Sequence, residues 1–166
     1  FGEFVEHEYG TPHLAAEELK GKIEAGDDVV VLDSRPLQEF LKMSIPGAIC
    51  CPGAELVYRV PEIVANPETL VVVNCAGRTR SIIGSQSLIN AGIPNRVVAL
   101  KNGTMGWHLA GYALEHGKSR LAPEVSARGL EQSKVFVEQV KKRFSVPSID
   151  MGQLQRFREQ SMESSL

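Results

Sequence analysis

The sequence predicts an α/β fold in which helices cover both faces of a parallel sheet. Three short apolar runs rich in β-branched residues lie at Val29–Asp33, Leu70–Asn74 and Val97–Leu100. None of them alternates with polar residues, which is typical of strands that are buried on both faces. Helix-forming stretches separate the runs, and right-handed crossovers would place those helices on both sides of the sheet.

Three helices are expected between the strands. One runs from Leu14 to Ala25, contains strong helix formers and ends at Gly26. Another covers residues 81–90 and is closed by the following Ala-Gly pair. A third covers roughly residues 54–65, where Pro61 is expected to restrict or kink it.

Composition excludes several classes of function. The chain has 166 residues, 43% of them apolar, which is enough for the core of one domain. A net charge of -2 gives no basic field for nucleic acid or for an anionic membrane. No apolar run approaches the ~18 residues of a membrane span, and no export signal is seen at the N-terminus, which favours a cytoplasmic location.

Because the first residue is Phe1, we expect the chain to be a piece of a longer protein.

The three cysteines are expected to be free thiols. Their number is odd, no Cys-x-x-C or histidine cluster has the spacing of a metal site, and a reducing compartment suits them. Cys50 and Cys51 are adjacent, so a disulfide between them would be strained. Cys50 is expected in the core. Cys51 either packs there too or lies near the sheet edge, where it could resolve a persulfide on Cys75.

The tail contains an amphipathic helix. Leu130, Val137 and Phe144 recur at seven-residue spacing with Val140 beside them. Packing against the helix's own domain is favoured over a coiled-coil dimer, because the pattern spans few heptads.

Beyond that helix, residues 148–154 resemble residues 13–19. The two segments share an aliphatic residue, an acid or amide, and a leucine at the same spacing. This similarity indicates either the opening of another copy of the domain or a chance likeness between two helix starts.

The strongest chemical signal is the segment Cys75–Ser81, which directly follows a predicted strand and precedes a predicted helix. A loop in that position aims backbone N–H groups inward, and the helix dipole favours anions there. Arg78 and Arg80 reinforce this field, so we expect Cys75 to be a reactive thiolate. The alternative is a small buried cysteine beside two ordinary surface arginines. The combination of strand, glycine, arginines and helix favours the functional interpretation.

This arrangement resembles the active-site loop of rhodanese-like domains. Cys75 to Arg80 reads Cys-x-x-x-x-Arg, which is the loop length of sulfur-transferring rhodaneses. Related dual-specificity phosphatases and arsenate reductases have one more residue in the loop, so a phosphatase or arsenate reductase is the less favoured alternative. A rhodanese-like binding or regulatory module without catalysis is a third possibility, but the presence of the cysteine disfavours it.

Two further segments carry the same resemblance. Residues 33–40 and 45–48 resemble the family's Asp-Val-Arg-x-x-x-Glu-Tyr/Phe and Ile-Pro-Gly-Ala signatures, with Met43-Ser44 where Gly-His is common. Residues 100–107 and 110–112 resemble its closing Gly-Gly-x-x-x-Trp and Ala-Gly-Tyr signatures.

The resemblance implies a rhodanese-like three-layer fold with a five-stranded parallel sheet, and no cofactor or metal. It divides the chain into a catalytic domain over residues 1–117 and a helical extension or linker over residues 118–166, towards possible neighbouring rhodanese modules. The family loop often has glycine at its fourth position, whereas this chain has Gly77 third and Arg78 fourth. We therefore expect the special backbone angle to shift by one residue.

The resemblance also implies roles for the loop. Cys75 would take sulfur from a small anionic donor such as thiosulfate, form a persulfide and pass the sulfur to cyanide or a thiol acceptor. Arg78 would meet the donor's sulfonate. Arg80 would either hold the anion or pin the loop by pairing with an acid. The residues expected to bind the substrate are Ala76, Gly77, Arg78, Thr79 and Arg80.

Three residues are expected to support the site. Ser81 lies where a side-chain oxygen could cap the helix that follows the loop. Asp33 and Arg35 end a strand at the same edge of the sheet, and a structural ion pair between them is favoured over a direct part in catalysis.

Overall fold

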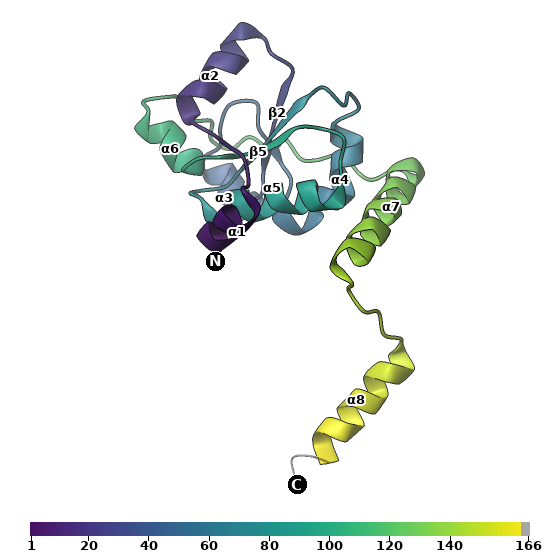
Figure 1. Ribbon diagram of the computed structural model, residues 1–166. Coiled ribbons are helices and arrows are strands. Elements are labelled where there is room, and N and C mark those ends of the chain that lie inside the picture. Colours follow the sequence, from purple (N-terminus) through teal and green to yellow (C-terminus); the bar gives the residue numbers. More distant parts are fainter. Residues whose placement is uncertain (164–166) are drawn as a thin grey trace.

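A computed structural model describes residues 1–163 and confirms the α/β fold (Figure 1). All strand pairs of its five-stranded sheet are parallel, and the strand order is β1-β5-β4-β2-β3. The three apolar runs form the three central strands, as expected. The strands are β1 (His13–Leu14), β2 (Val29–Asp33), β3 (Ile49–Cys50), β4 (Leu70–Asn74) and β5 (Val97–Leu100).

Helices connect the strands and extend the chain at both ends. They are α1 (Gly2–Tyr9), α2 (Ala16–Ala25), α3 (Leu37–Lys42), α4 (Leu56–Ile63), α5 (Thr79–Ala91), α6 (Gly103–Leu109), α7 (Ala127–Phe144) and α8 (Met151–Glu163), with a 3₁₀ turn over Gly53–Glu55 before α4.

The starts of all three predicted helices were wrong. Helix α5 begins at Thr79 and not at residue 81, and the other two starts differ for physical reasons. The helix expected from Leu14 begins at Ala16, because the residues before it pair with β5 as a short edge strand. The helix expected from residue 54 starts as a 3₁₀ turn, and α4 is shorter than predicted. Pro61 does lie inside α4, which ends two residues later at Ile63.

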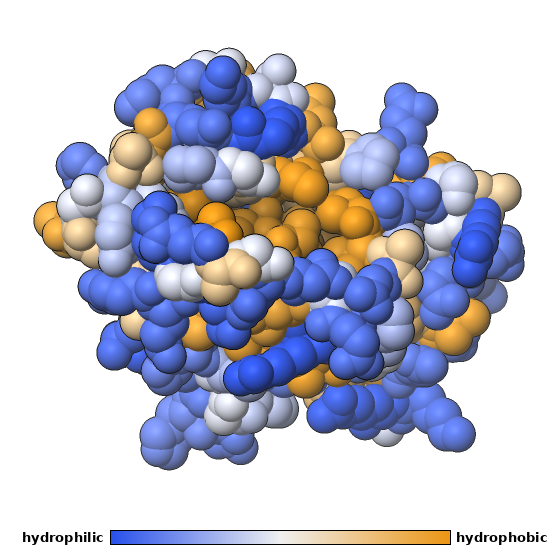
Figure 2. Space-filling model, turned by 90° about the horizontal axis from the view of Figure 1, so that it is seen from above, coloured by the Kyte–Doolittle hydropathy of each residue, from blue (hydrophilic) through white to orange (hydrophobic). Residues whose placement is uncertain are grey.

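The sheet buries an apolar cluster on each face. Trp107 of α6 and Phe40 of α3 pack with Leu19 of α2 on one face. Leu56 of α4 and Leu88 of α5 pack on the other. Seen from above in Figure 2, the surface is hydrophilic around its rim and apolar in a central hollow between the surrounding elements. The two apolar clusters therefore give the carboxyl ends of the strands a closely packed support.

Helix α7 packs against its own domain, as expected, but through a different face. Leu130 and Val137 are 41% and 52% exposed, whereas Gly129, Ser133 and Phe136 are buried. The small residues allow a close approach to α4, where the Ser133 hydroxyl donates to the Tyr58 carbonyl at 3.1 Å. The heptad pattern failed here because it counted only apolar residues, and the buried stripe contains a glycine and a serine.

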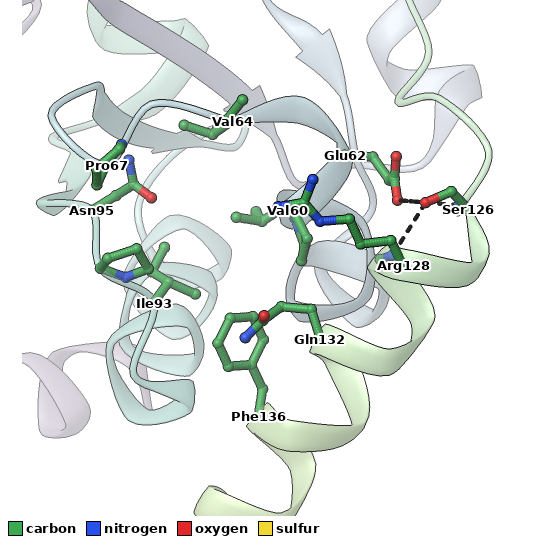
Figure 3. A pocket seen from close by; sticks show the side chains of 14 residues that line it. Val60, Glu62, Val64, Pro67, Ile93, Asn95, Ser126, Arg128, Gln132 and Phe136 are labelled. Atoms are coloured by element: carbon green, nitrogen blue, oxygen red, sulfur yellow. Dashed lines mark hydrogen bonds between the residues drawn. The ribbon is translucent and has the colours of Figure 1, made fainter.

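The N-terminus of α7 is held by a carboxylate of α4. The Glu62 side chain accepts from the Ser126 hydroxyl at 2.6 Å and from its backbone N–H at 3.1 Å (Figure 3). The Ser126 hydroxyl in turn accepts from the N–H of Gly129, so it caps the helix. A negative charge at a helix N-terminus is stabilising, which anchors α7 to the domain.

The segment between the domain and α7 also returns to the sheet. Cys50 of β3 pairs with Leu121 in a parallel bridge, with backbone hydrogen bonds of 2.8 and 3.0 Å to Arg120 and Ala122. Helix α8 lies apart from the rest of the described chain (Figure 1). Over residues 1–163, no helix is long and apolar enough to cross a membrane.

We predict that Phe136→Ala lowers the free energy of unfolding by about 3 kcal/mol, because it removes a buried ring between α7 and α4. The matched change Val137→Ala, on the exposed face, should alter it by less than about 0.5 kcal/mol. Urea denaturation of both variants tests this. Equal losses from the two variants would show that α7 does not dock through the Phe136 face.

Candidate active site

The cysteine loop lies between the end of β4 and the start of α5. Cys75 follows Asn74 directly, and its residue is 2% exposed. The first helical hydrogen bond of α5 runs from the Ile82 N–H to the Arg78 carbonyl at 3.2 Å. No residue that the structure describes accepts a hydrogen bond from the N–H groups of residues 76–81. A row of unpaired amides at a helix N-terminus forms a concavity that favours anions.

Helix α6 fixes the direction of these amides by binding the loop's carbonyl groups. The N–H of Thr104 donates to the Cys75 carbonyl at 2.8 Å, and the N–H of Met105 donates to the Ala76 carbonyl at 3.0 Å. Because a trans peptide points its N–H opposite to its C=O, the N–H groups of Ala76 and Gly77 are turned away from α6. The loop's donors are therefore set before any ligand arrives.

A buried polar chain leads from β2 to the same carbonyl. Arg35 donates to both carboxylate oxygens of Asp33, at 2.8 and 2.7 Å, and forms the ion pair that we expected. Asn74 donates to Asp33 at 2.9 Å and to the Thr104 hydroxyl at 3.0 Å. The Thr104 hydroxyl then donates to the Cys75 carbonyl at 3.2 Å. The donors of this network each have a defined acceptor, whereas Asn74 Oδ1 is buried without a hydrogen-bond partner among the described residues. The network thus favours one loop conformation.

The expectation that Ser81 caps the helix was wrong. Helix α5 begins two residues earlier, at Thr79, with Arg78 in the cap position. Instead, the Ser81 hydroxyl donates to the Arg78 carbonyl at 2.7 Å and lies 3.6 Å from the Cys75 sulfur. The Cys75 thiol is the donor in this contact. A serine hydroxyl has one proton, so it can donate to a negatively charged sulfur only by rotating away from the Arg78 carbonyl.

The expected shift of a special backbone angle within the loop was also wrong. Arg78 has φ -125°, and Gly77 is not among the described residues with positive φ. The left-handed angles occur instead at the start of α6, at Asn102 (φ 61°) and Gly103 (φ 55°). A Cβ atom on Gly103 would lie 2.2 Å from the Cys75 carbonyl oxygen, whereas one on Gly77 would meet nothing within 4 Å. The glycine that the loop requires is therefore outside the loop.

Arg78 is paired with acidic residues of α1. Its guanidinium contacts Glu3 at 3.1 Å and also forms a close pair with Glu6. Helix α1 packs against the first turn of α5 so closely that a Cβ on Gly2 would lie 2.9 Å from the Cα of Thr79. Two carboxylates therefore form ion pairs with Arg78, the arginine that was expected to bind the sulfonate of the donor.

Arg80 is paired with Glu39 of α3 through two hydrogen bonds of 2.9 and 2.8 Å. This contact corresponds to the loop-pinning role among the two expected for Arg80. The Arg80 hydrogen bond and charge hold the pKa of Glu39 below its usual range. The same hydrogen bond raises the pKa of Arg80, and the charge of Glu39 adds to that shift.

The other two cysteines are held as neutral thiols. Burial raises the pKa of Cys50 to about 11 and that of Cys51 to about 12. Cys51 packs in the apolar cluster with Leu56 and Val60, which agrees with the core alternative for this residue. Among the described residues, no group of three or more His, Cys, Asp or Glu side chains is placed to hold a metal ion.

A pocket of about 630 Å³ lies between α4, α7 and the turns before β4 and β5 (Figure 3). Val60, Ile93 and Phe136 line it. Its Pro67 and Pro94 precede the strands that Cys75 and Lys101 follow. The pocket therefore lies at the opposite edge of the sheet from the cysteine loop and is not part of this site.

Sequence reasoning missed Asn74, Gly103 and Thr104. Asn74 was recognised only as the last residue of a predicted strand, with no role. The other two lie in the closing signature near residue 103, which was used for the resemblance alone. The resemblance of this segment to a family signature, far along the chain from the cysteine, was the available sign that it contacts the loop.

The chain belongs to the rhodanese-like domain family, whose sequence pattern matches residues 15–110. Its structure is similar to that of a thiosulfate sulfurtransferase from Pseudomonas aeruginosa, with 50% identity and a TM-score of 0.92. That match covers 96% of this chain and 30% of the Pseudomonas chain.

Two curated proteins are also similar. One is a helix-turn-helix transcriptional regulator of Mycobacterium tuberculosis, 32% identical over 65% of this chain and 47% of its own length. The other is a putative sulfur carrier protein of Bacillus subtilis, 26% identical over 58% of this chain and 50% of its own length. The chain thus spans about half of these curated relatives and less than a third of the Pseudomonas protein.

We predict that Gly103→Ala destabilises the protein by about 3 kcal/mol or more, because the new methyl group would collide with the loop carbonyls at a positive φ. Gly77→Ala should cost less than about 1 kcal/mol, since the methyl group enters open space. Urea unfolding of the two variants compares them directly. A Gly103→Ala variant as stable as Gly77→Ala would contradict the contact between α6 and the loop.

Proposed function

We propose that this domain is a sulfurtransferase that carries sulfane sulfur on Cys75. The observation that carries the proposal is the row of unaccepted N–H groups at residues 76–81, which begins directly after that cysteine. Family membership and the similarity to a thiosulfate sulfurtransferase support the same chemistry. The six-residue loop from Cys75 to Arg80 suits one sulfur atom on the cysteine better than a tetrahedral phosphate.

In the first step, the Cys75 thiolate attacks the outer sulfur of a donor such as thiosulfate. A bond forms between the cysteine sulfur and the outer sulfur, and the bond between the two donor sulfurs breaks. The electron pair leaves with sulfite, and the cysteine becomes a persulfide, Cys–S–S⁻. No oxidant or cofactor enters this balance.

In the second step, cyanide or a thiolate attacks the outer persulfide sulfur. The new bond to the acceptor forms as the sulfur–sulfur bond breaks, and its electron pair returns to Cys75 as a thiolate. The acceptor leaves as thiocyanate or as a new persulfide. The cycle is a double displacement.

The backbone amides would stabilise the negative charge in both steps. Charge on the persulfide or the leaving anion would face fixed dipoles, as in an oxyanion hole. The Ser81 hydroxyl, which accepts from the Cys75 thiol at 3.6 Å, would donate to the same charge after rotating away from the Arg78 carbonyl. Arg80 would hold the loop through Glu39, while Ala76, Gly77 and Thr79 would contribute their N–H groups.

We predict that the chain forms thiocyanate from thiosulfate and cyanide and that Cys75→Ser abolishes this activity. Mass spectrometry after thiosulfate alone should show about 32 Da added to Cys75, the mass of one sulfur. Cys51→Ser is the control and should keep both activity and adduct. A folded wild-type chain with no adduct from any sulfane-sulfur donor would favour a binding or regulatory module instead.

The carboxylates of α1 should weaken the binding of small dianions. They neutralise Arg78, so a sulfonate that uses this guanidinium must compete with Glu3 and Glu6. The double variant Glu3→Gln/Glu6→Gln should therefore lower the KM for thiosulfate about two- to fivefold, since exposed ion pairs contribute up to about 1 kcal/mol.

A control with the same charge change separates this contact from a general field effect. Glu8→Gln/Glu17→Gln removes two carboxylates from exposed positions, and neither of them pairs with Arg78. Steady-state kinetics at constant ionic strength should leave the KM of this control near the wild-type value. An equal change in both variants would show that Arg78 does not bind the donor.

A further inference from the structure

The chain contains a structural repeat that extends into α8. Helix α1 ends at Tyr9 and α7 ends at Phe144, while α2 begins at Ala16 and α8 begins at Met151. Both intervals are 135 residues. The repeat therefore has one fixed offset at two separate helix boundaries.

The turn after each helix has the same backbone conformation. Gly10, which follows α1, has φ 62° and ψ 36°. Ser145, which follows α7, has φ 50° and ψ 41°. A left-handed angle is uncommon for serine, so the agreement reflects more than helix propensity. Two residues after this position, both segments have a proline, Pro12 and Pro147.

At the start of each following helix, the side chain of the third helical residue accepts from the backbone N–H of the N-cap residue. In α2, the Glu18 side chain accepts from the N–H of Ala15 at 2.8 Å. In α8, the Gln153 side chain accepts from the N–H of Asp150 at 2.9 Å, and the Asp150 carboxylate accepts from the N–H of Gln153 at 2.7 Å. These residues again correspond at the offset of 135. A shared helix-start sequence alone would not reproduce the preceding turn and proline.

The corresponding apolar residues of the two segments differ in how far they are buried. Leu14 and Leu19 are 7% and 0% exposed, because β1 and α2 pack on the sheet. Their counterparts are Ile149 and Leu154. Ile149 is 50% exposed and Leu154 is only partly buried, and Met151 beside them is 78% exposed. The second segment has the apolar residues of a domain opening without the sheet that would bury them.

We propose that residues 145–163 are the opening turn, first strand and first helix of a second domain of the same fold. The apolar side of α8 would dock on the sheet of that domain, as α2 docks on the sheet described here. In the first domain, the carbonyls of Pro12 and Leu14 accept from the N–H groups of Ala99 and Lys101 at 2.8 and 2.9 Å. The strand equivalent to β5 in the second domain would donate to Pro147 and Ile149 in the same way.

The likeness starts at the turn and not in the preceding helix. Val137 corresponds to Gly2, where a Cβ would approach the Cα of Thr79 to 2.9 Å. Lys141 corresponds to Glu6, so the charge that pairs with Arg78 is reversed. Helix α7 therefore would not reproduce the acidic cover that α1 places on the first loop.

An extended chain tests the proposal without relying on sulfur transfer. Residues 26–144 of this protein are joined directly after residue 160, so that α8 takes the place of α2 in the appended copy. We expect the appended copy to fold. It should resist limited proteolysis as well as the first domain does, and its counterparts of Ala99 and Lys101 should show slow amide exchange.

The matched control carries Ile149→Asp and Leu154→Asp in the same extended chain. It should lose the appended copy to proteolysis and keep the first domain. A second extended chain with Gly152→Glu, the residue that α2 has at this place, removes the low helix propensity of glycine as a cause of failure. Digestion of the appended copy in both extended chains, or protection unaffected by the two aspartates, would overturn the proposal.

Discussion

The buried ion pair between Asp33 and Arg35 is the interaction on which the site depends. Two charges inside a core are costly unless their hydrogen bonds are satisfied, and here Arg35 also donates to the Met43 carbonyl at 2.7 Å while Asp33 accepts from Asn74. Asn74 uses both of its N–H groups, so its amide can take only one orientation. That orientation sets the Thr104 hydroxyl, which binds the Cys75 carbonyl. Loss of any member would leave a buried polar group unpaired.

Backbone amides are the unpaired donors of the cysteine loop, because carboxylates already pair with its guanidinium groups. Arg78 is paired with α1 and Arg80 with Glu39, while six consecutive amides have no acceptor among the described residues. Fixed dipoles stabilise charge without having to reorganise during a reaction. The arginines then act mainly on the position of the loop, and α1 adjusts how strongly a small dianion is attracted.

The sequence predicted the parts of this protein that depend on local patterns. The strand runs, the loop at Cys75 and the Asp33–Arg35 pair all follow from neighbouring residues. It did not predict Thr104 or Gly103, because their role depends on a contact between segments far apart in the chain. It misplaced the buried face of α7, since close helix packing there uses Gly129 and Ser133 and not the leucine and valine beside them.

The most direct test is the rate at which thiosulfate loads sulfur onto Cys75 in Thr104→Val. This change keeps the shape of the side chain but removes the hydroxyl that joins Asn74 to the Cys75 carbonyl. Thr69→Val, which removes a hydroxyl bonded to Asp28 far from the loop, is the control. Our account predicts a loading rate about tenfold lower per folded molecule in Thr104→Val and unchanged in Thr69→Val. A wild-type rate in folded Thr104→Val would contradict the claim that this buried chain sets the loop.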